Sequence, residues 1–456
     1  MSSVSSGSES EREREEEVYS SSSEDEGDVQ NKRIKLAKEY LSGLDGEDVE
    51  TTLESNLLEK SNKMNKFISA NLNIKTVRSI KHKSPLTHAI ISFTSTTPIL
   101  VFSAKDNNLY TQPLNSKDRH RLPTRHPLCL ATSPDFNWLA VGTSINTIDI
   151  YNTQTSPFSL ITTIPGFKDS ITSLSFRKST PTALFAASLD RSIKIYSFPP
   201  SPPDPPSYVE TLFGHQDSIY SVDVLRSDLA LSVGCRDKSA RYWKVVDESQ
   251  LVFRGGGRSK IRDMIDGALD FDAQGMDVDG EPIRRGKQAG FVEGSLDVCA
   301  MIDEQHFLTG GDSGFISLWN IGKKKAIYTS YLAHGVHHHH SETEGVIKQP
   351  RGITALAAFP YSDLFASGSS DGYIRLWRID ANLKAFSKLA EIDAKGFVNS
   401  IQLVQEEQEK DQLVLVAATA QEPRMGRWEK LPSSAAKNAI VVAHLTHQKN
   451  STQSSL

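Results

Sequence analysis

From about residue 86 onward, the chain is a succession of short runs in which apolar and polar residues alternate, separated by clusters of Gly, Asp, Asn, Ser and Pro. Such alternation is typical of β-strands with one buried face, and the polar clusters are typical of turns. One run recurs: LDRSIKIY, RDKSARYW, DSGFISLW and SDGYIRLW end at Tyr196, Trp243, Trp319 and Trp377. A short unit that recurs in this way cannot bury a core alone, so the pattern predicts stacked repeats.

The aromatic residue that ends the third strand of each repeat can be followed along the chain. We place it at Tyr110, Tyr151, Tyr196, Trp243, Trp319, Trp377 and Trp428, at spacings of 41, 45, 47, 76, 58 and 51 residues. A four-stranded propeller blade takes about 40–45 residues, so the longer spacings indicate insertions, the largest at about 254–290. The sequence therefore predicts an all-β fold, a seven-bladed β-propeller over residues 86–446.

Three repeats carry an aspartate six residues before the strand-ending aromatic, the position of the tight-turn aspartate of WD repeats. Gly214-His215 precedes one of them at the interval usual for these repeats, so we expect His215, Asp237 and Trp243 to form a hydrogen-bonded set. Ser313 stands at the aspartate position of the fifth blade, whereas the first, second and seventh blades lack the pattern. The expected structural residues are Asp190, Asp237, Asp371, His215, Trp243, Trp319 and Trp377.

The segments outside the repeats differ in charge. The chain has 456 residues and a net charge of −5, but residues 1–30 contain ten acidic and two basic residues, so this tail carries −8 and the rest +3. With almost no large apolar side chain, the tail is predicted to be disordered. Ser21–Ser23 precede acidic residues in a phosphorylation context, although a purely solvating tail is the simpler interpretation. Residues 447–456 are expected to form a polar C-terminal tail.

Residues 31–45 predict a short basic amphipathic helix, followed by a polar linker to residue 85. Ile34, Ala37, Leu41 and Leu44 fall on one helical stripe. The basic residues on the remaining surface also fit a nuclear-localisation cluster or a partner-binding helix. They are Lys32, Arg33, Lys35 and Lys38.

The chain contains no sequence motif for catalysis or nucleotide binding, so we expect neither an enzyme nor a cofactor. His334 and His337–His340 invite a metal site, but consecutive histidines rarely offer tetrahedral geometry and no Cys or Asp cluster accompanies them. A solvated loop without metal is favoured. The cysteines, Cys129, Cys235 and Cys299, are far apart and are expected to be buried free thiols in a reducing compartment.

The hydrophobic pattern also bears on membranes. No apolar run approaches the roughly 18 residues that a membrane span requires, and the N-terminus is polar and acidic rather than an apolar leader. We therefore expect a soluble intracellular protein without a membrane partner.

Segments that depart from the regular repeat are more specific than the repeat itself. They read KRIKLAKEYL from residue 32, DESQLVF at 247–253, FVEGSLD at 291–297, Ala333-His334-Gly335, and QEPRMGRW at 421–428. Together with the repeats, they resemble the WD-repeat family of U3 small nucleolar RNA-interacting proteins. The resemblance covers about 31–50 and most of 85–445.

The resemblance implies a non-catalytic subunit of the U3 box C/D small nucleolar ribonucleoprotein in the nucleus and nucleolus. It implies binding to the box B/C region of U3 small nucleolar RNA, beside the kink-turn-binding protein and other box C/D core proteins. It also implies association with small-subunit processome proteins, and a role in pre-rRNA processing for 18S rRNA and small-subunit biogenesis. No small-molecule substrate is implied.

RNA affinity would come chiefly from Lys and Arg side chains that meet phosphates, and base recognition from unpaired nucleotides. The candidates in turns and at strand ends are Arg191, Arg236, Lys238, Arg351, Arg375, Arg424 and Arg427. Arg424 and Arg427 stand out because they lie within 421–428. For each residue the alternative is a solvated blade edge or packing on a neighbouring turn.

A different class of function fits the same repeats. WD-repeat proteins also serve as adaptors that hold only proteins, such as ubiquitin-ligase substrate receptors or chromatin-complex subunits, because the fold does not fix the function.

Overall fold

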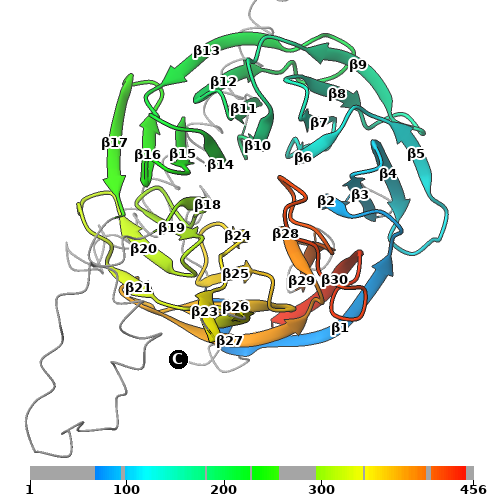
Figure 1. The fold of residues 1–456 in the computed structure, drawn as a ribbon. Coiled ribbons are helices and arrows are strands. Elements are labelled where there is room, and N and C mark those ends of the chain that lie inside the picture. Colours follow the sequence, from blue (N-terminus) through cyan, green and yellow to red (C-terminus); the bar gives the residue numbers. More distant parts are fainter. Residues whose placement is uncertain are drawn as a thin grey trace, which may run out of the picture. The chain divides into compact units, whose positions relative to one another are not determined.

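The computed structural model describes residues 67–93, 98–179, 182–225, 228–255, 294–341, 345–406 and 412–447. These residues form seven four-stranded antiparallel sheets arranged in a ring, and one two-stranded sheet (Figure 1). The seven-bladed propeller predicted from the repeats is confirmed. The acidic tail, the basic segment with Lys32, Arg33, Lys35 and Lys38, and nearly all of the 254–290 insertion and the C-terminal tail lie outside the described residues. Within the described ranges, no helix has the length and apolar character needed to cross a membrane.

Each blade is an up-and-down meander whose first strand lies nearest the ring axis. The first three blades contain β2 (Leu86–Phe93), β3 (Pro98–Ala104), β4 (Asn108–Pro113), β5 (His120–Pro123); β6 (Pro127–Thr132), β7 (Trp138–Thr143), β8 (Ile148–Asn152), β9 (Ser159–Ile164); and β10 (Ile171–Phe176), β11 (Ala183–Ser188), β12 (Ser192–Ser197), β13 (Ser207–Phe213).

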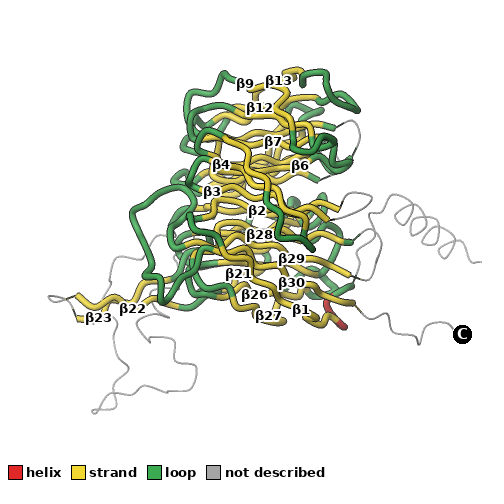
Figure 2. The backbone as a smooth tube through the Cα atoms, turned by 90° about the vertical axis from the view of Figure 1, so that its right-hand side faces the viewer, coloured by secondary structure: helices red, strands yellow, loops and turns green. Residues whose placement is uncertain are grey.

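The next three blades follow the same order. They contain β14 (Ile219–Val224), β15 (Leu229–Gly234), β16 (Ser239–Lys244), β17 (Ser249–Arg254); β18 (Leu296–Met301), β19 (His306–Gly311), β20 (Ile316–Asn320), β21 (Tyr328–Ser330); and β24 (Ala355–Ala358), β25 (Leu364–Gly368), β26 (Tyr373–Ile379), β27 (Phe386–Asp393). Between the last two of these blades, β22 (Val336–Ser341) and β23 (Gly345–Pro350) form a hairpin that projects from the ring (Figure 2).

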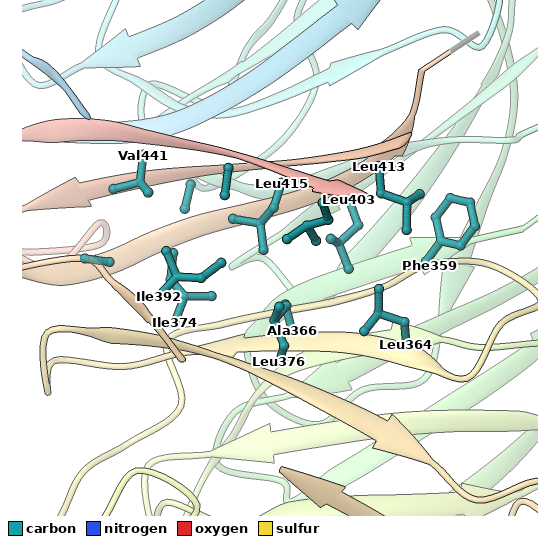
Figure 3. Packing of buried hydrophobic residues seen from close by; sticks show 14 of the residues in the cluster. Phe359, Leu364, Ala366, Ile374, Leu376, Ile392, Leu403, Leu413, Leu415 and Val441 are labelled. Atoms are coloured by element: carbon teal, nitrogen blue, oxygen red, sulfur yellow. The ribbon is translucent and has the colours of Figure 1, made fainter. Parts of the chain in front are cut away.

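The core consists of seven apolar layers, each between two neighbouring blades. Figure 3 shows the layer between the sixth and seventh blades, where Leu364 and Leu376 face Leu413 and Leu415. All four side chains are buried, with at most 3 % of their surface exposed. Burying one such side chain stabilises the fold by about 1.5–3 kcal/mol, so each blade depends on both of its neighbours.

The aromatic residue of the third strand belongs to the layer shared with the preceding blade. Trp377 stacks on Phe365 with ring centroids 5.9 Å apart, and Trp319 stacks on Phe307 at 6.0 Å. Trp243 packs in the layer between the third and fourth blades. These contacts explain why an aromatic residue recurs at this position.

The seventh blade is built from both ends of the ring. β28 (Phe397–Gln405), β29 (Gln412–Ala420) and β30 (Ala439–His447) are completed by β1 (Leu72–Lys81), which pairs antiparallel with β30 along its whole length. The propeller therefore takes in residues that the sequence analysis assigned to the linker before residue 86. Most of β1 is exposed, so it lacks the apolar alternation by which the other strands were found.

The seventh blade also corrects the assignment of Trp428. Its third strand is β30, and Trp428 lies in the connection between β29 and β30, with its side chain exposed. β30 instead contributes the aliphatic residues Val441, Ala443 and Leu445 to the layer against the sixth blade. A search for aromatic residues at a fixed spacing fails here, because the 18-residue connection 421–438 places the third strand later in the sequence than the spacing predicts.

A buried carboxylate anchors the start of the closing strand. Asp363 lies in the turn before β25, and its oxygens accept hydrogen bonds from the backbone N–H of Ile68 at 2.8 Å and of Ser69 at 3.1 Å. The Ser69 hydroxyl donates a third bond. These residues lead into the 3-10 helix η1 (Ser69–Asn71) and then into β1. The sixth blade thus holds the segment that closes the seventh.

We expect Asp363→Ala to lower the free energy of unfolding by about 2–4 kcal/mol, because it leaves two buried N–H groups and a hydroxyl without an acceptor. Asp363→Asn, which retains one carbonyl oxygen, should lose less. Urea unfolding measures both. Asp393→Ala, at an exposed position of β27, is the matched control; an equal loss in the control would contradict the anchoring role.

Candidate nucleic-acid interface

One face of the ring carries the connections between the second and third strands of all seven blades, and we call it the turn face. These connections are residues 105–107, 144–147, 189–191, 235–238, 312–315, 369–372 and 421–438. The connections that enter the first strand of each blade lie on the same side, as shown by Ser218 Oγ donating to Leu189 O and Ser369 Oγ donating to Gly352 O.

In the fourth blade, a chain of four side chains holds the turn face to the core. His215 Nδ1 lies 2.8 Å from Asp237 Oδ2, and His215 Nε2 lies 2.8 Å from Ser232 Oγ. Trp243 Nε1 donates to the same serine hydroxyl at 2.8 Å. The set expected from His215, Asp237 and Trp243 is present, and Ser232 is its missing link. Ser232 was not predicted from the sequence, although Ser367 of the sixth blade stands at nearly the same distance before its Trp.

The sixth blade contains the same chain, and this corrects the interpretation of His334. Its Nδ1 lies 2.8 Å from Asp371 Oδ2 and its Nε2 lies 2.8 Å from Ser367 Oγ, which accepts from Trp377 Nε1. His334 is therefore a buried blade residue and not part of a solvated loop. The reason it was missed is that the β22–β23 hairpin separates it from the rest of its blade. His337–His340 lie in β22.

The other structural residues occupy related positions. Asp190 Oδ2 accepts from Lys168 N at 2.9 Å, and Phe167 takes the place of the histidine in the third blade. Trp319 Nε1 donates to Thr309 Oγ1, and Ser313 Oγ accepts from Gly294 N at 2.7 Å.

Within the described ranges, no group of three His, Cys, Asp or Glu side chains is arranged to hold a metal ion.

The cysteines are free thiols in the structure. Cys129 and Cys299 are buried, and Cys235 is half-buried. Burial raises the pKa of the Cys235 thiol to about 11, with the nearby Asp297 carboxylate acting in the same direction. A thiol of this kind remains protonated at neutral pH and is a poor nucleophile.

The carboxylate of Asp237 is tuned by its partners. Burial acts to raise the pKa of Asp237, but the hydrogen bond and charge of His215 and the donors of Ser239 outweigh it and hold this pKa at about 2. An unfolded aspartate has a pKa near 3.9, so the ionised form favours the folded state above that pH. This contribution disappears as the pH falls through the folded-state pKa.

We therefore expect Asp237 to contribute about 2 kcal/mol to stability above pH ~4 and to lose this contribution between pH ~4 and pH ~2. Asp237→Asn should be less stable than the parent at neutral pH and should show a flatter stability profile across that acid window. Thermal unfolding at a series of pH values measures it. Asp247→Asn, whose side chain is exposed, is the control; parallel acid profiles for the parent and Asp237→Asn would contradict the prediction.

The connection 421–438 of the seventh blade is fastened to the first blade. Lys105 Nζ, from the turn between β3 and β4, donates to Pro423 O at 2.7 Å and to Gly426 O at 2.6 Å, and lies 3.5 Å from Glu422 Oε2. Glu422 is buried, and two further cations point toward it: Arg427 at 3.8 Å and Lys430 at 3.7 Å. One carboxylate thus gathers three cations on the turn face.

Arg424 turns inward from the same connection. Its Nη1 donates to Thr172 O of β10, on the third blade, at 2.9 Å, so the side chain reaches across the ring. It lines a central cavity of about 460 Å³ together with residues of the inner strands, including His88. Burial lowers the pKa of His88 to about 3 and the charge of Arg424 acts in the same direction, so His88 is neutral there.

The remaining RNA-binding candidates divide into two groups. Arg191 and Arg236 are exposed on the turn face, with Lys238 half-buried beside Arg236. By contrast, Arg351 and Arg375 hold the blade together. Arg351 donates to Ser370 O at 3.0 Å, and Arg375 bonds to Glu391 at 3.0 Å, pairs with Asp371 and donates to Ala333 O.

Arg427 is exposed, with 74 % of its side chain accessible, and Lys430 is similarly accessible. Arg427 was predicted from the sequence, whereas Lys430, Lys105 and Glu422 were not. Lys430 lies just beyond the segment that carried the family resemblance, and Lys105 comes from a blade more than 300 residues away in the chain.

Known proteins with similar sequences contain the same kind of repeat. The family model described as WD domain, G-beta repeat matches residues 158–197, 206–244 and 342–378. A relative in Saccharomyces cerevisiae, ribosomal RNA-processing protein 9, is 35 % identical over 66 % of this chain and 55 % of its own length. U3 small nucleolar RNA-interacting protein 2 of Mus musculus is 31 % identical over 34 % of this chain and 30 % of its own length.

The solved structure of U3-55K is 28 % identical and superposes with a TM-score of 0.63, covering 83 % of this chain and 99 % of that one. The chain spans about half the length of the curated relatives that it matches.

A ring of seven antiparallel blades with buried Asp–His–Ser–Trp chains defines a WD-repeat propeller. Beyond the fold, the chain is similar over most of its propeller to ribosomal RNA-processing protein 9 and to the solved structure of U3-55K, and over a shorter stretch to U3 small nucleolar RNA-interacting protein 2. It therefore resembles the WD-repeat family of U3 small nucleolar RNA-interacting proteins.

Proposed function

We propose that this protein is a non-catalytic subunit of the U3 box C/D small nucleolar ribonucleoprotein that binds U3 small nucleolar RNA and supports pre-rRNA processing for the small ribosomal subunit. The observation that carries the proposal is the similarity to these proteins, since one relative is named for ribosomal RNA processing and another for interaction with U3 small nucleolar RNA. The proposal includes the box B/C region as the bound RNA and the nucleolus as the location. The kink-turn-binding protein and small-subunit processome proteins are the proposed protein partners.

The turn face supports RNA binding on physical grounds. Its exposed cations are contributed by separate blades and by the 421–438 connection, so they are spread over a surface rather than confined to one strand. They include Arg191, Arg236, Arg427 and Lys430, with Lys238 half-buried among them. Neutralising phosphates with Lys and Arg releases counterions, and this supplies much of the affinity of proteins for nucleic acids.

The pair Arg427 and Lys430 is the strongest candidate for phosphate contact. Both side chains are exposed, and both belong to the 421–438 connection, which Lys105 holds in place. Their ion pairs with Glu422 are long, 3.8 and 3.7 Å, so a phosphate can compete for them. Arg424, Arg351 and Arg375 are committed to backbone carbonyls and carboxylates of the propeller itself, so replacing them would disturb the fold before it reported on RNA.

We expect the double variant Arg427→Glu, Lys430→Glu to bind U3 small nucleolar RNA at least about tenfold more weakly, with a flatter dependence of affinity on salt, because two phosphate contacts are lost. Gel-shift titrations at several salt concentrations measure both quantities. Thermal unfolding should change little, because both side chains are exposed, their ion pairs with Glu422 are long, and Lys105 still pairs with Glu422.

The matched control is Lys388→Glu, a charge reversal on the outer strand of the sixth blade, where the side chain is also exposed. It should leave RNA affinity within about twofold of the parent. Equal affinities for the double variant and the parent would remove the 421–438 connection from the proposed interface.

The basic segment 31–45 has a separate proposed role in nuclear import and in contacts with particle proteins or RNA. We expect a chain without residues 1–50 to lose nucleolar accumulation and to assemble less U3 particle, since the deletion removes Lys32, Arg33, Lys35 and Lys38. Imaging of a tagged protein and recovery of U3 RNA with it are the measurements. Normal localisation together with normal assembly would exclude this role.

Crosslinking followed by sequencing of the bound RNA tests the proposed function as a whole. Enrichment of U3 small nucleolar RNA is the expected result. Protein partners without any enriched RNA would instead identify a protein-only adaptor, the alternative that the repeats allow.

A further inference from the structure

Trp428 differs from every other tryptophan of the chain. The chain has five, and the four within strands, Trp138, Trp243, Trp319 and Trp377, are at most 6 % exposed. Trp428 is 73 % exposed and lies on the turn face, in the connection between β29 and β30. A large apolar ring left in solvent, away from any blade layer, suggests a surface that meets a partner.

The indole ring of Trp428 packs directly over Gly426, which has no side chain to displace it. A Cβ atom at Gly426 would lie 1.7 Å from Cζ3 of the indole and 1.9 Å from Cε3, so only glycine admits the ring at this place. The carbonyl of Gly426 is in turn fixed by Lys105 Nζ at 2.6 Å. The ring therefore lies on an anchored segment, which lowers the entropic cost of using it for binding.

Positive charge borders this ring. Arg427 precedes it, Lys430 follows two residues later, and Glu422 pairs with both from a largely buried position. An exposed indole next to exposed cations matches the chemistry of an unpaired nucleotide, which offers a π-face and a phosphate together. A paired base in a duplex offers the phosphate but keeps its face stacked inside the helix.

We propose that Trp428 stacks on an unpaired base of the bound RNA while Arg427 and Lys430 contact the adjacent phosphates. This inference rests on the proposed function, because it names the kind of RNA segment that the 421–438 connection receives: single-stranded, and selected by stacking rather than by base-edge hydrogen bonds. Trp428 is then a binding residue, and Gly426 is a positioning residue that acts through it.

Fluorescence gives a direct test, since Trp428 is the exposed one among five tryptophans. The signal of Trp428 is the difference between the emission of the parent and that of Trp428→Phe. We expect U3 small nucleolar RNA, oligouridylate and oligoadenylate to quench this difference signal and to protect it from acrylamide. A blunt RNA duplex should leave it unchanged.

Affinity measurements provide the second readout. Trp428→Ala should bind the single-stranded oligonucleotides about ten- to one-hundredfold more weakly, and Trp428→Phe should lose less, because base–aromatic stacking contributes strongly per base. Gly426→Ala should weaken binding although the indole remains, because the ring is displaced. Duplex affinity should stay within about twofold for all three variants.

Phe213→Ala is the matched control, because Phe213 is 72 % exposed at the end of β13, on a different blade. It should leave single-stranded affinity unchanged. Equal losses in Phe213→Ala and Trp428→Ala would show a nonspecific effect and would overturn the proposal.

The outcomes separate this inference from the proposed function. U3 RNA bound with normal affinity and no change at Trp428 would overturn the stacking proposal and leave the proposed function standing. Protection of Trp428 by a particle protein, with no effect of any RNA, would mark the connection as a protein interface and overturn it as well. Failure of the intact protein to associate with U3 RNA in crosslinking would overturn both.

Discussion

The structure depends on packing between blades, because no blade has a core of its own. Both faces of each sheet carry apolar residues, and these are buried only when a blade lies between two others. The seven layers are equivalent in kind, but not in composition. Six include an aromatic residue of a third strand. The layer between the sixth and seventh blades has no such aromatic and consists of aliphatic side chains together with Phe359 from the turn after β24. The blade that departs from the repeat is also the blade that closes the ring.

That departure links the fold to the candidate interface. In the regular blades the turn between the second and third strands is short and fixed by an aspartate, as at Asp237 and Asp371. In the seventh blade a long connection replaces it, and Lys105 and Glu422 take over the role of the aspartate. Because this connection is not a tight turn, Arg424 can extend into the central cavity while Trp428 and Arg427 remain exposed to solvent. One segment thereby combines a structural side chain with exposed ones.

The repeats allowed the ring, the blade number and the set of His215, Asp237 and Trp243 to be predicted, because their spacing is preserved in the sequence. Other features escaped for physical reasons. Strand β1 is mostly exposed, and its partner lies at the other end of the chain, so neither alternation nor proximity marks it. His334 is separated from its blade by the hairpin. Ser232 and Ser367 could not be singled out, because serine is common throughout a turn-rich sequence.

The candidate interface was predicted less completely than the ring. Seven basic residues could be proposed from their places in turns, but only the contacts separate Arg427, which is exposed, from Arg375, which is bound on several sides. The sequence placed Trp428 in a strand because it follows an expected period. Its accessibility depends on Gly426 and Lys105, which no local pattern connects with it.

The pairing of β1 with β30 has a consequence for biosynthesis. The two strands are in contact although 373 residues separate Asn73 from Thr446. During translation, β1 leaves the ribosome long before its partner exists, so every blade in between is made while the ring is still open. Such a high contact order slows folding and leaves strand edges uncovered for a time. The many exposed and charged positions of β1 suit a strand that must wait in solvent. Pairing of β1 with β30 can therefore occur only after all seven blades have been synthesised.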